Sequence, residues 1–142
     1  MATQVKESFQ VSDPDKAWGM LTDINKLIPC VPGATVKSAD SPTKADAEIE
    51  VQMGSMAMKF TGPVEIVEQD AGSKRAVIKA AAKEASGQSN AEGTVTIQIS
   101  GDGGTVDGTA NVTGKAASMG EGTVQAVLKQ LVSQFTGNLA KA

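Results

Sequence analysis

Hydrophobic and polar residues alternate along most of this chain, and a period of two is typical of half-buried β-strands. Val5, Phe9 and Val11 alternate with polar residues near the N-terminus. The same alternation recurs in successive segments between residues 33 and 113. Its apolar positions include Ala45, Ala47, Ile49, Val51, Met53, Met56, Met58, Phe60, Val64, Ile66, Ala76, Ile78, Ala80, Ala82, Val95, Ile97, Ile99, Val106, Ala110 and Val112. The pattern predicts an antiparallel meander with one polar face and one apolar face.

Two short helices are expected after the first strand. Residues 12–15, Ser-Asp-Pro-Asp, offer N-cap oxygens, a proline suited to the first helical position and an early carboxylate. The helix that follows contains Trp18 and Leu21. Asp23 can cap a second short turn, which the prolines of residues 29–33 bring to an end.

The C-terminal segment has a helical period instead. At about 100° per residue, its apolar side chains fall within an arc of about 140°, the width of a helix that packs on a core. They are Val124, Val127, Leu128, Leu131, Val132, Phe135 and Leu139, while Gln125, Lys129, Ser133 and Thr136 are expected to point outward. We therefore predict an α+β helix-grip fold, in which a seven-stranded curved antiparallel sheet surrounds a long C-terminal helix, with two short helices after strand 1.

The composition favours a binding protein over an enzyme. The 142 residues include no histidine, no tyrosine and one cysteine, and histidine is the side chain that most often moves protons near pH 7. With only three phenylalanines and one tryptophan, the apolar interior depends on Ala, Val, Ile, Leu and Met. A sheet lined with such small groups can leave its interior unfilled.

Charge and length exclude several classes of protein. Thirteen basic and sixteen acidic residues leave a formal charge of −3 without a basic run, so no nucleic acid is expected as a partner. The first ten residues lack a signal-peptide core, and no stretch of about eighteen apolar residues occurs. We expect one domain over residues 1–142 in a cytoplasmic protein.

Several short motifs, in this order, resemble the CoxG family of carbon monoxide dehydrogenase, within the START-like (SRPBCC) superfamily. They are Phe9-x-Val11, Asp13-Pro14-x-x-Ala17-Trp18, Thr22-Asp23, Ile28-Pro29-x-x-Pro32-Gly33, Gly54, Phe60-x-Gly62 and the glycines before the last strand. The resemblance implies an accessory protein of a molybdenum CO dehydrogenase or a related molybdenum hydroxylase, peripheral at the cytoplasmic face of the membrane. Longer members of such families carry a membrane-targeting tail after the helix, which we expect to be absent from a chain that stops at Ala142.

The small inner residues predict an apolar cavity between the helix and the sheet. The expected lining is Met53, Met56, Met58, Phe60, Ile66, Ile78, Ala80, Val95, Ile97, Ala110, Val112, Val124, Val127, Leu128 and Leu131. The mouth is expected at Ile24, Leu27, Ile28, Val31 and Met119. The alternative is a tightly curled sheet with the helix packed flush against it. In that case the methionines only end two core strands.

Candidate polar groups are few. Glu7 and Glu84 share the parity of apolar neighbours, which makes them the candidates for a polar contact to a ligand head group. Cys30 lies between two prolines in a chain without histidine, so we expect an unreactive thiol. Neither a metal site nor a covalent cofactor is expected, because the choice of metal ligands is poor.

These features predict a non-enzymatic carrier of a lipophilic ligand. CO dehydrogenase delivers electrons to a respiratory chain, so the resemblance favours a bound quinone, such as menaquinone or ubiquinone, or another isoprenoid lipid taken from the membrane. Two alternatives stay open. One is a structural adaptor that docks the dehydrogenase at the membrane without a ligand, and the other is a cyclase or dehydratase of the kind found on this fold.

Overall fold

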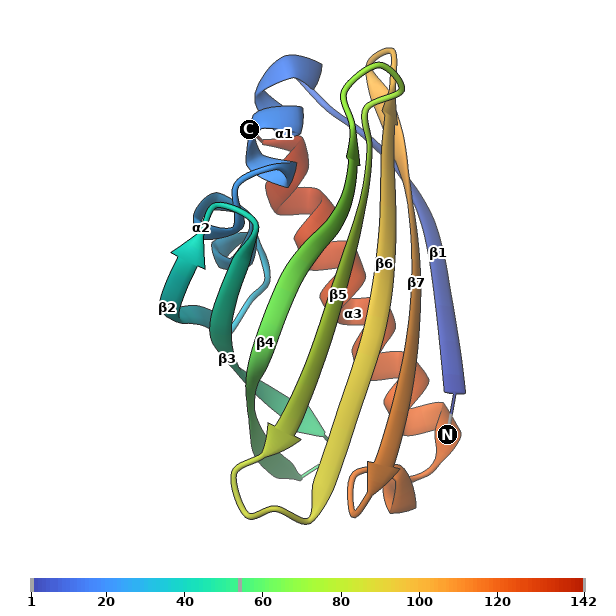
Figure 1. Cartoon of the computed structure of the whole chain (residues 1–142). Coiled ribbons are helices and arrows are strands. Elements are labelled where there is room, and N and C mark those ends of the chain that lie inside the picture. Colours follow the sequence, from blue (N-terminus) through green and yellow to red (C-terminus); the bar gives the residue numbers. More distant parts are fainter. Residues whose placement is uncertain (1, 54, 142) are drawn as a thin grey trace.

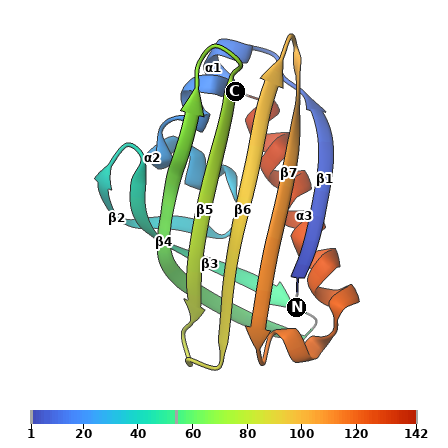
Figure 2. The ribbon, with the colours of Figure 1, turned by 45° about the vertical axis from the view of Figure 1, so that its right-hand side comes forward.

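A computed structural model describes residues 2–53 and 55–141, with the side chains of Met53 and Met56 outside the described part. Seven strands form one antiparallel sheet in the order β1-β7-β6-β5-β4-β3-β2. They are β1 (Ala2–Gln10), β2 (Ala34–Ser41), β3 (Lys44–Met53), β4 (Met56–Asp70), β5 (Arg75–Glu84), β6 (Ser89–Ser100) and β7 (Gly103–Gly114). The helices are α1 (Pro14–Leu21), α2 (Ile24–Leu27) and α3 (Glu121–Ala140), with single turns η1 (Ile28–Cys30) and η2 (Ala117–Met119). The sheet curls around α3, which confirms the predicted α+β helix-grip fold (Figure 1, Figure 2).

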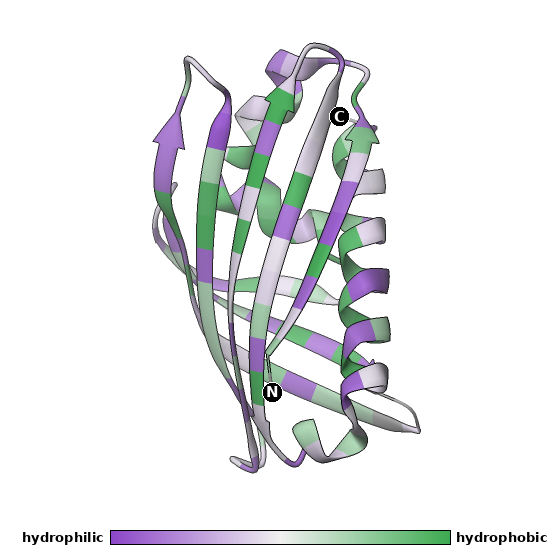
Figure 3. Cartoon of the chain, turned by 90° about the vertical axis from the view of Figure 1, so that its right-hand side faces the viewer, coloured by the Kyte–Doolittle hydropathy of each residue, from purple (hydrophilic) through white to green (hydrophobic). Residues whose placement is uncertain are grey.

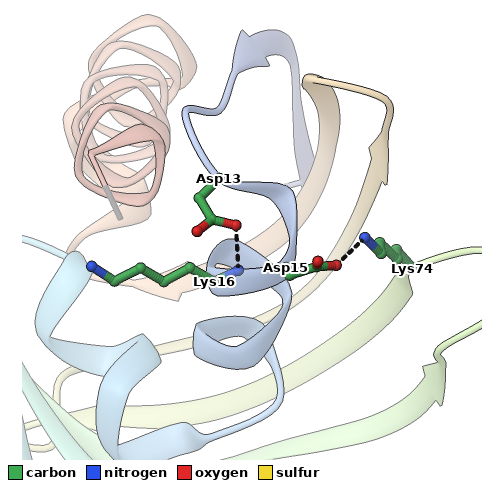
Figure 4. Close-up of polar contacts among 4 residues, drawn as sticks. All are labelled: Asp13, Asp15, Lys16 and Lys74. Carbon is green, nitrogen blue, oxygen red and sulfur yellow. Dashed lines mark hydrogen bonds and ion pairs between the residues drawn. The ribbon is translucent and has the colours of Figure 1, made fainter.

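Helix α1 begins with the capping pattern expected from the sequence. The carboxylate of Asp13 accepts a hydrogen bond from the backbone N–H of Lys16 at 3.2 Å, and Pro14 lies in the first turn. Asp15 in the same turn pairs with Nζ of Lys74 at 2.8 Å (Figure 4). The hydrogen bond and the charge of Lys74 hold the pKa of the Asp15 carboxyl below its usual value. This exposed pair joins α1 to the turn between β4 and β5.

Helix α3 is fixed to the rest of the molecule near both ends. Toward its C-terminus, the side-chain amide of Asn138 donates a hydrogen bond to the backbone carbonyl of Cys30 in η1 at 2.8 Å. Just before its N-terminus, the buried hydroxyl of Ser89 in β6 accepts a hydrogen bond from the backbone N–H of Ala116 at 2.8 Å. The position of the helix over the sheet is therefore fixed outside its central turns.

One flank of α3 is also hydrogen-bonded to the edge strand β1. The amide of Gln125 donates to the carbonyl of Gln4 at 2.8 Å, and the hydroxyl of Ser133 donates to the carboxylate of Glu7 at 2.5 Å. Ser133 is exposed, as expected, whereas Gln125 is half-buried because the curled sheet brings β1 against this flank. Thr136, also expected to point outward, is buried. Figure 3 shows the hydrophobic residues of α3 on the side turned toward the sheet.

Two hydrophobic clusters lie under opposite ends of α3. The larger contains Phe135 and Leu139 from the C-terminal half of the helix. Its other buried members include Leu21, Ile24, Ile66, Ile97, Ile99 and Val106. The smaller contains Val124 near the start of the helix, packed with Val51, Met58, Phe60, Val112 and Ala116. These clusters pack against the two ends of the helix. Whether the space under its middle turns is filled depends on the side chains that lie between the two clusters.

A register shift between Ile66 and Glu68 interrupts the alternation along β4. Val67, at the shift, is 45% exposed, whereas Val77 on β5 is buried although its parity is that of outward-facing residues. An extra residue in one strand changes the face on which the neighbouring side chains lie. The simple period of two therefore fails at this point of the sheet.

Gly62 lies where the backbones of β4 and β5 come close together. A Cβ at this position would lie 1.9 Å from the carbonyl oxygen of Ala81. We predict that Gly62→Ala lowers the free energy of unfolding by about 1–3 kcal/mol, the usual cost of overpacking, as measured by urea denaturation. Gly19→Ala is the control, because nothing lies within 4 Å of its new methyl group. Since alanine favours a helix more than glycine does, this variant should raise the free energy of unfolding by about 0.5–1 kcal/mol. A Gly62→Ala variant as stable as the wild type would contradict the close approach.

Candidate functional site

An apolar cavity of about 340 Å³ lies between the middle of α3 and the inner face of the sheet. We call it the first chamber. Its apolar lining consists of Leu27, Ile28, Val31, Ala34, Ala47, Ile49, Phe60, Pro63, Val64, Ile78, Ala80, Ala81, Ala82, Val95, Ile97, Val106, Leu128, Leu131, Val132 and Phe135, with Gly62 and Glu48. The chamber thus extends from η1 and the C-terminal half of α3 across β3, β4, β5 and β6.

A second chamber of about 200 Å³ adjoins the first toward the N-terminal end of α3. It is lined by Ile49, Val51, Phe60, Ala80, Ala82, Ala91, Glu92, Gly93, Ala110, Val112, Val124, Val127, Leu128 and Leu131. Several of these residues also line the first chamber, so the two cavities are neighbours under the same helix.

Small side chains in the middle of the sheet leave this space unfilled. Ala80 and Ala110 are only half-buried although they lie on the inner face, whereas Ala76, farther along the same strand as Ala80, is completely buried. The structure therefore has open space under the middle of α3, whereas both ends of the helix are packed.

Charged groups lie only at the edges of the two chambers. Glu48, in the first chamber, pairs with Nζ of Lys37 at 3.5 Å. Glu92, in the second, is exposed. All other side chains that line either chamber are uncharged. The interior therefore offers hydrocarbon contacts and little that could hold a polar ligand.

Most of the predicted lining residues do lie at the chambers. They are Phe60, Ile78, Ala80, Val95, Ile97, Ala110, Val112, Val124, Val127, Leu128 and Leu131. Met58 and Ile66 instead fill the smaller and the larger cluster. The predictions for Met53 and Met56 fall outside the described side chains. That any of these residues binds a ligand stays a prediction.

The residues predicted for the mouth lie in different parts of the structure. Leu27, Ile28 and Val31 line the first chamber. Ile24 is completely buried in the larger cluster, and its backbone N–H donates to the carbonyl of Pro42 at 2.7 Å. Met119 packs against the smaller cluster and lines neither chamber. These two residues therefore lie outside the lining of both chambers, and the position of the mouth stays a prediction.

Strand β3 contributes lining residues that the prediction of the site left out. Ala47, Ile49 and Val51 lie on the inner face, and Ile49 pairs with Phe60 across the β3–β4 ladder. The period of two already placed these residues on the apolar face. The pairing of β3 with β4, which sets Ile49 opposite the predicted residue Phe60, was the missing information.

The two predicted polar contacts are used elsewhere. The carboxylate of Glu7 accepts the hydrogen bond from Ser133 on α3. The carboxylate of Glu84 accepts hydrogen bonds from the hydroxyl and from the backbone N–H of Ser86, the latter at 2.8 Å, and chiefly the hydroxyl lowers the pKa of Glu84. Neither carboxylate lines a chamber, so neither is placed to hold a head group there.

The described residues offer little for catalysis. The thiol of Cys30 is buried, which raises its pKa, and it donates to the carbonyl of Lys26 at 3.6 Å. Among residues 2–53 and 55–141, no three His, Cys, Asp or Glu side chains are grouped so that they could hold a metal ion. Within the same ranges, no helix has the length and apolar character needed to span a bilayer.

The sequence matches one family model. The family is the CoxG subunit of carbon monoxide dehydrogenase, and its model matches residues 8–142. No curated protein matches the chain.

Solved structures resemble this chain over almost its whole length. A conserved protein from Geobacillus kaustophilus has a TM-score of 0.75 at 18% identity, with 99% of this chain and 93% of that chain covered. The ZhuI aromatase/cyclase from Streptomyces sp. R1128 has a TM-score of 0.64 at 9% identity, with 99% and 92% covered. Truncated norcoclaurine synthase from Thalictrum flavum has a TM-score of 0.60 at 9% identity, again with 99% and 92% covered. At these identities the similarity shows the helix-grip fold and nothing about the reaction.

Two alanines on β5 allow a substitution at the cavity to be compared with the same substitution in the packed core. Ala80 lines both chambers, whereas Ala76, on the same face, is completely buried. We predict that Ala80→Leu changes the free energy of unfolding by less than about 1 kcal/mol, while Ala76→Leu lowers it by about 1–3 kcal/mol or more. Urea denaturation of both variants measures this difference. If both variants are destabilised equally, the space at Ala80 is not open.

Proposed function

This chain belongs to the CoxG family of carbon monoxide dehydrogenase, and we propose that it carries a respiratory quinone whose tail lies under α3. The protein takes menaquinone, ubiquinone or a related isoprenoid lipid from the membrane. It then presents the head group to a molybdenum CO dehydrogenase or a related molybdenum hydroxylase at the cytoplasmic face. In this proposal the protein itself catalyses no reaction. The observation that carries the proposal is the pair of adjoining apolar chambers.

The lining favours a hydrocarbon tail over a polar ligand. Removing a CH₂ group from water contributes about 0.8 kcal/mol, and a polar group buried without a hydrogen-bond partner costs free energy. Ile49, Phe60 and Leu128, which line both chambers, offer only apolar contacts. A quinone has a long apolar tail and a polar ring, so we place the tail in the chambers and the ring near their opening.

We place the opening between α3 and β3. The opposite flank of the helix is hydrogen-bonded to β1 through Gln125 and Ser133. On the β3 side, Ala47 and Ile49 are half-buried apolar residues of the first chamber. A tail can enter here without breaking the contacts that hold α3 to the edge strand.

The family name supports a link to CO dehydrogenase. Oxidation of CO releases electrons that must leave the enzyme, and a membrane quinone is a carrier that can accept them. The long tail keeps a quinone in the bilayer, because its transfer into water is unfavourable. A protein that covers the tail removes this obstacle, which is why a carrier fits the cavity better than a docking adaptor does.

The carrier and the adaptor differ in what the purified protein contains. We expect native mass spectrometry to show a lipid adduct on protein isolated from quinone-producing cells, and an organic extract of the same sample to contain a quinone. A dehydrogenase complex that forms while the accessory protein carries no lipid would support the adaptor instead. Turnover of an extracted small molecule by the protein alone would favour an enzyme.

A charge inside the chambers should block uptake. Leu128 lines both chambers, whereas Gln130 is exposed on the same helix. We predict that Leu128→Asp reduces quinone transfer from vesicles to the protein by at least about tenfold, because a carboxylate strongly resists apolar surroundings. Gln130→Asp places the same residue in α3 and should transfer quinone at the wild-type rate. Equal rates for both variants would show that the tail lies elsewhere.

A further inference from the structure

The two chambers share part of their lining under the middle of α3. Phe60 on β4 and Leu128 and Leu131 on α3 line both cavities. The side chain of Phe60 is almost completely buried in the smaller cluster, whereas Leu128 and Leu131 are half-buried. The small residues Ala80 and Ala82 also line both chambers. These shared residues therefore mark the place where the two chambers adjoin.

The sizes of the chambers correspond to definite lengths of chain. An apolar cavity of about 150 Å³ holds one benzene molecule, which has six carbons. By this measure the first chamber, at 340 Å³, holds about fourteen carbons. The second, at 200 Å³, holds about eight more. The first chamber thus has room for two to three isoprene units, and both together have room for about four.

We propose that the site selects its lipid by tail length, with the first two to three isoprene units in the first chamber and the rest of a four-unit tail beyond Phe60 and Leu128 in the second. This inference rests on the proposed function and specifies its ligand class as isoprenoids of about twenty carbons or more. Because Phe60, Leu128 and Leu131 line both chambers, the two spaces adjoin and one continuous chain can fill both. A chain that ended between them would leave one chamber empty. An empty apolar cavity forfeits dispersion contacts on all of its walls.

The chain offers a matched pair of substitutions to test this. Ala110 lines only the second chamber and Ala47 only the first, and both are half-buried on the inner face of a strand. Leucine at either position occupies part of one chamber and leaves the other unchanged. Geraniol, with ten carbons, and geranylgeraniol, with twenty, are probes that share a hydroxyl head group and differ in tail length.

The measured quantity is the ratio of the two dissociation constants, from native mass spectrometry of delipidated protein. A longer alcohol binds any apolar site more tightly, because more of its chain leaves water. The ratio for the wild type alone is therefore not informative, and the test is how far each substitution changes it. We expect Ala110→Leu to weaken the binding of geranylgeraniol by about tenfold or more and the binding of geraniol by less than about twofold. Ala47→Leu should weaken the binding of both alcohols by similar factors.

The outcomes separate this inference from the proposed function. If Ala110→Leu weakens the binding of both alcohols equally, or of neither, the second chamber does not sense tail length. The inference then fails, while the proposed lipid-binding function is unaffected. If the wild type binds neither alcohol and carries no lipid from cells, both proposals fail. Urea denaturation checks that each variant folds, and Ala91→Leu, which also lies only at the second chamber, replaces Ala110→Leu if that variant does not.

Discussion

The space inside this protein depends on how α3 is held. Asn138 fixes the helix to η1, and Ser89 fixes the segment just before it to β6. Packed clusters support both of its ends. Between these supports the sheet presents alanines, and the helix cannot move down onto them without breaking contacts elsewhere. The contacts at both ends of the helix, its hydrogen bonds to β1 along one flank and the small side chains of the sheet together account for the cavity.

An unfilled cavity has a cost that a ligand can remove. Its walls lack the dispersion contacts of a packed core, and a hydrocarbon chain restores them. A ligand that binds only the folded state also stabilises that state by mass action. The chambers thus make the protein less stable when empty, and this same feature provides the driving force for taking a tail from a membrane. Glu48 and Glu92 at the edges leave the interior apolar, so specificity has to come from shape.

The alternation of apolar residues was sufficient to predict the sheet, its inner face and the covering helix. It could not distinguish inner residues that fill a cluster, such as Met58, from those that line a cavity, such as Ala80. That distinction depends on hydrogen bonds between distant parts of the chain, such as Asn138 with Cys30, which no local pattern contains. Glu7 shows the same limit, because its partner Ser133 is on α3, on a face that a helical wheel assigned to solvent.

Methyl NMR of the delipidated protein with a bound quinone tests the central claim most directly. Tail protons should give intermolecular NOEs to the methyl groups of Leu128 and Leu131 on α3 and Val112 on the sheet, which line the chambers. Val67, exposed on the other face of the sheet, should give none. NOEs confined to Val67, or a tail that contacts no methyl group under α3, would contradict a ligand site between the helix and the sheet.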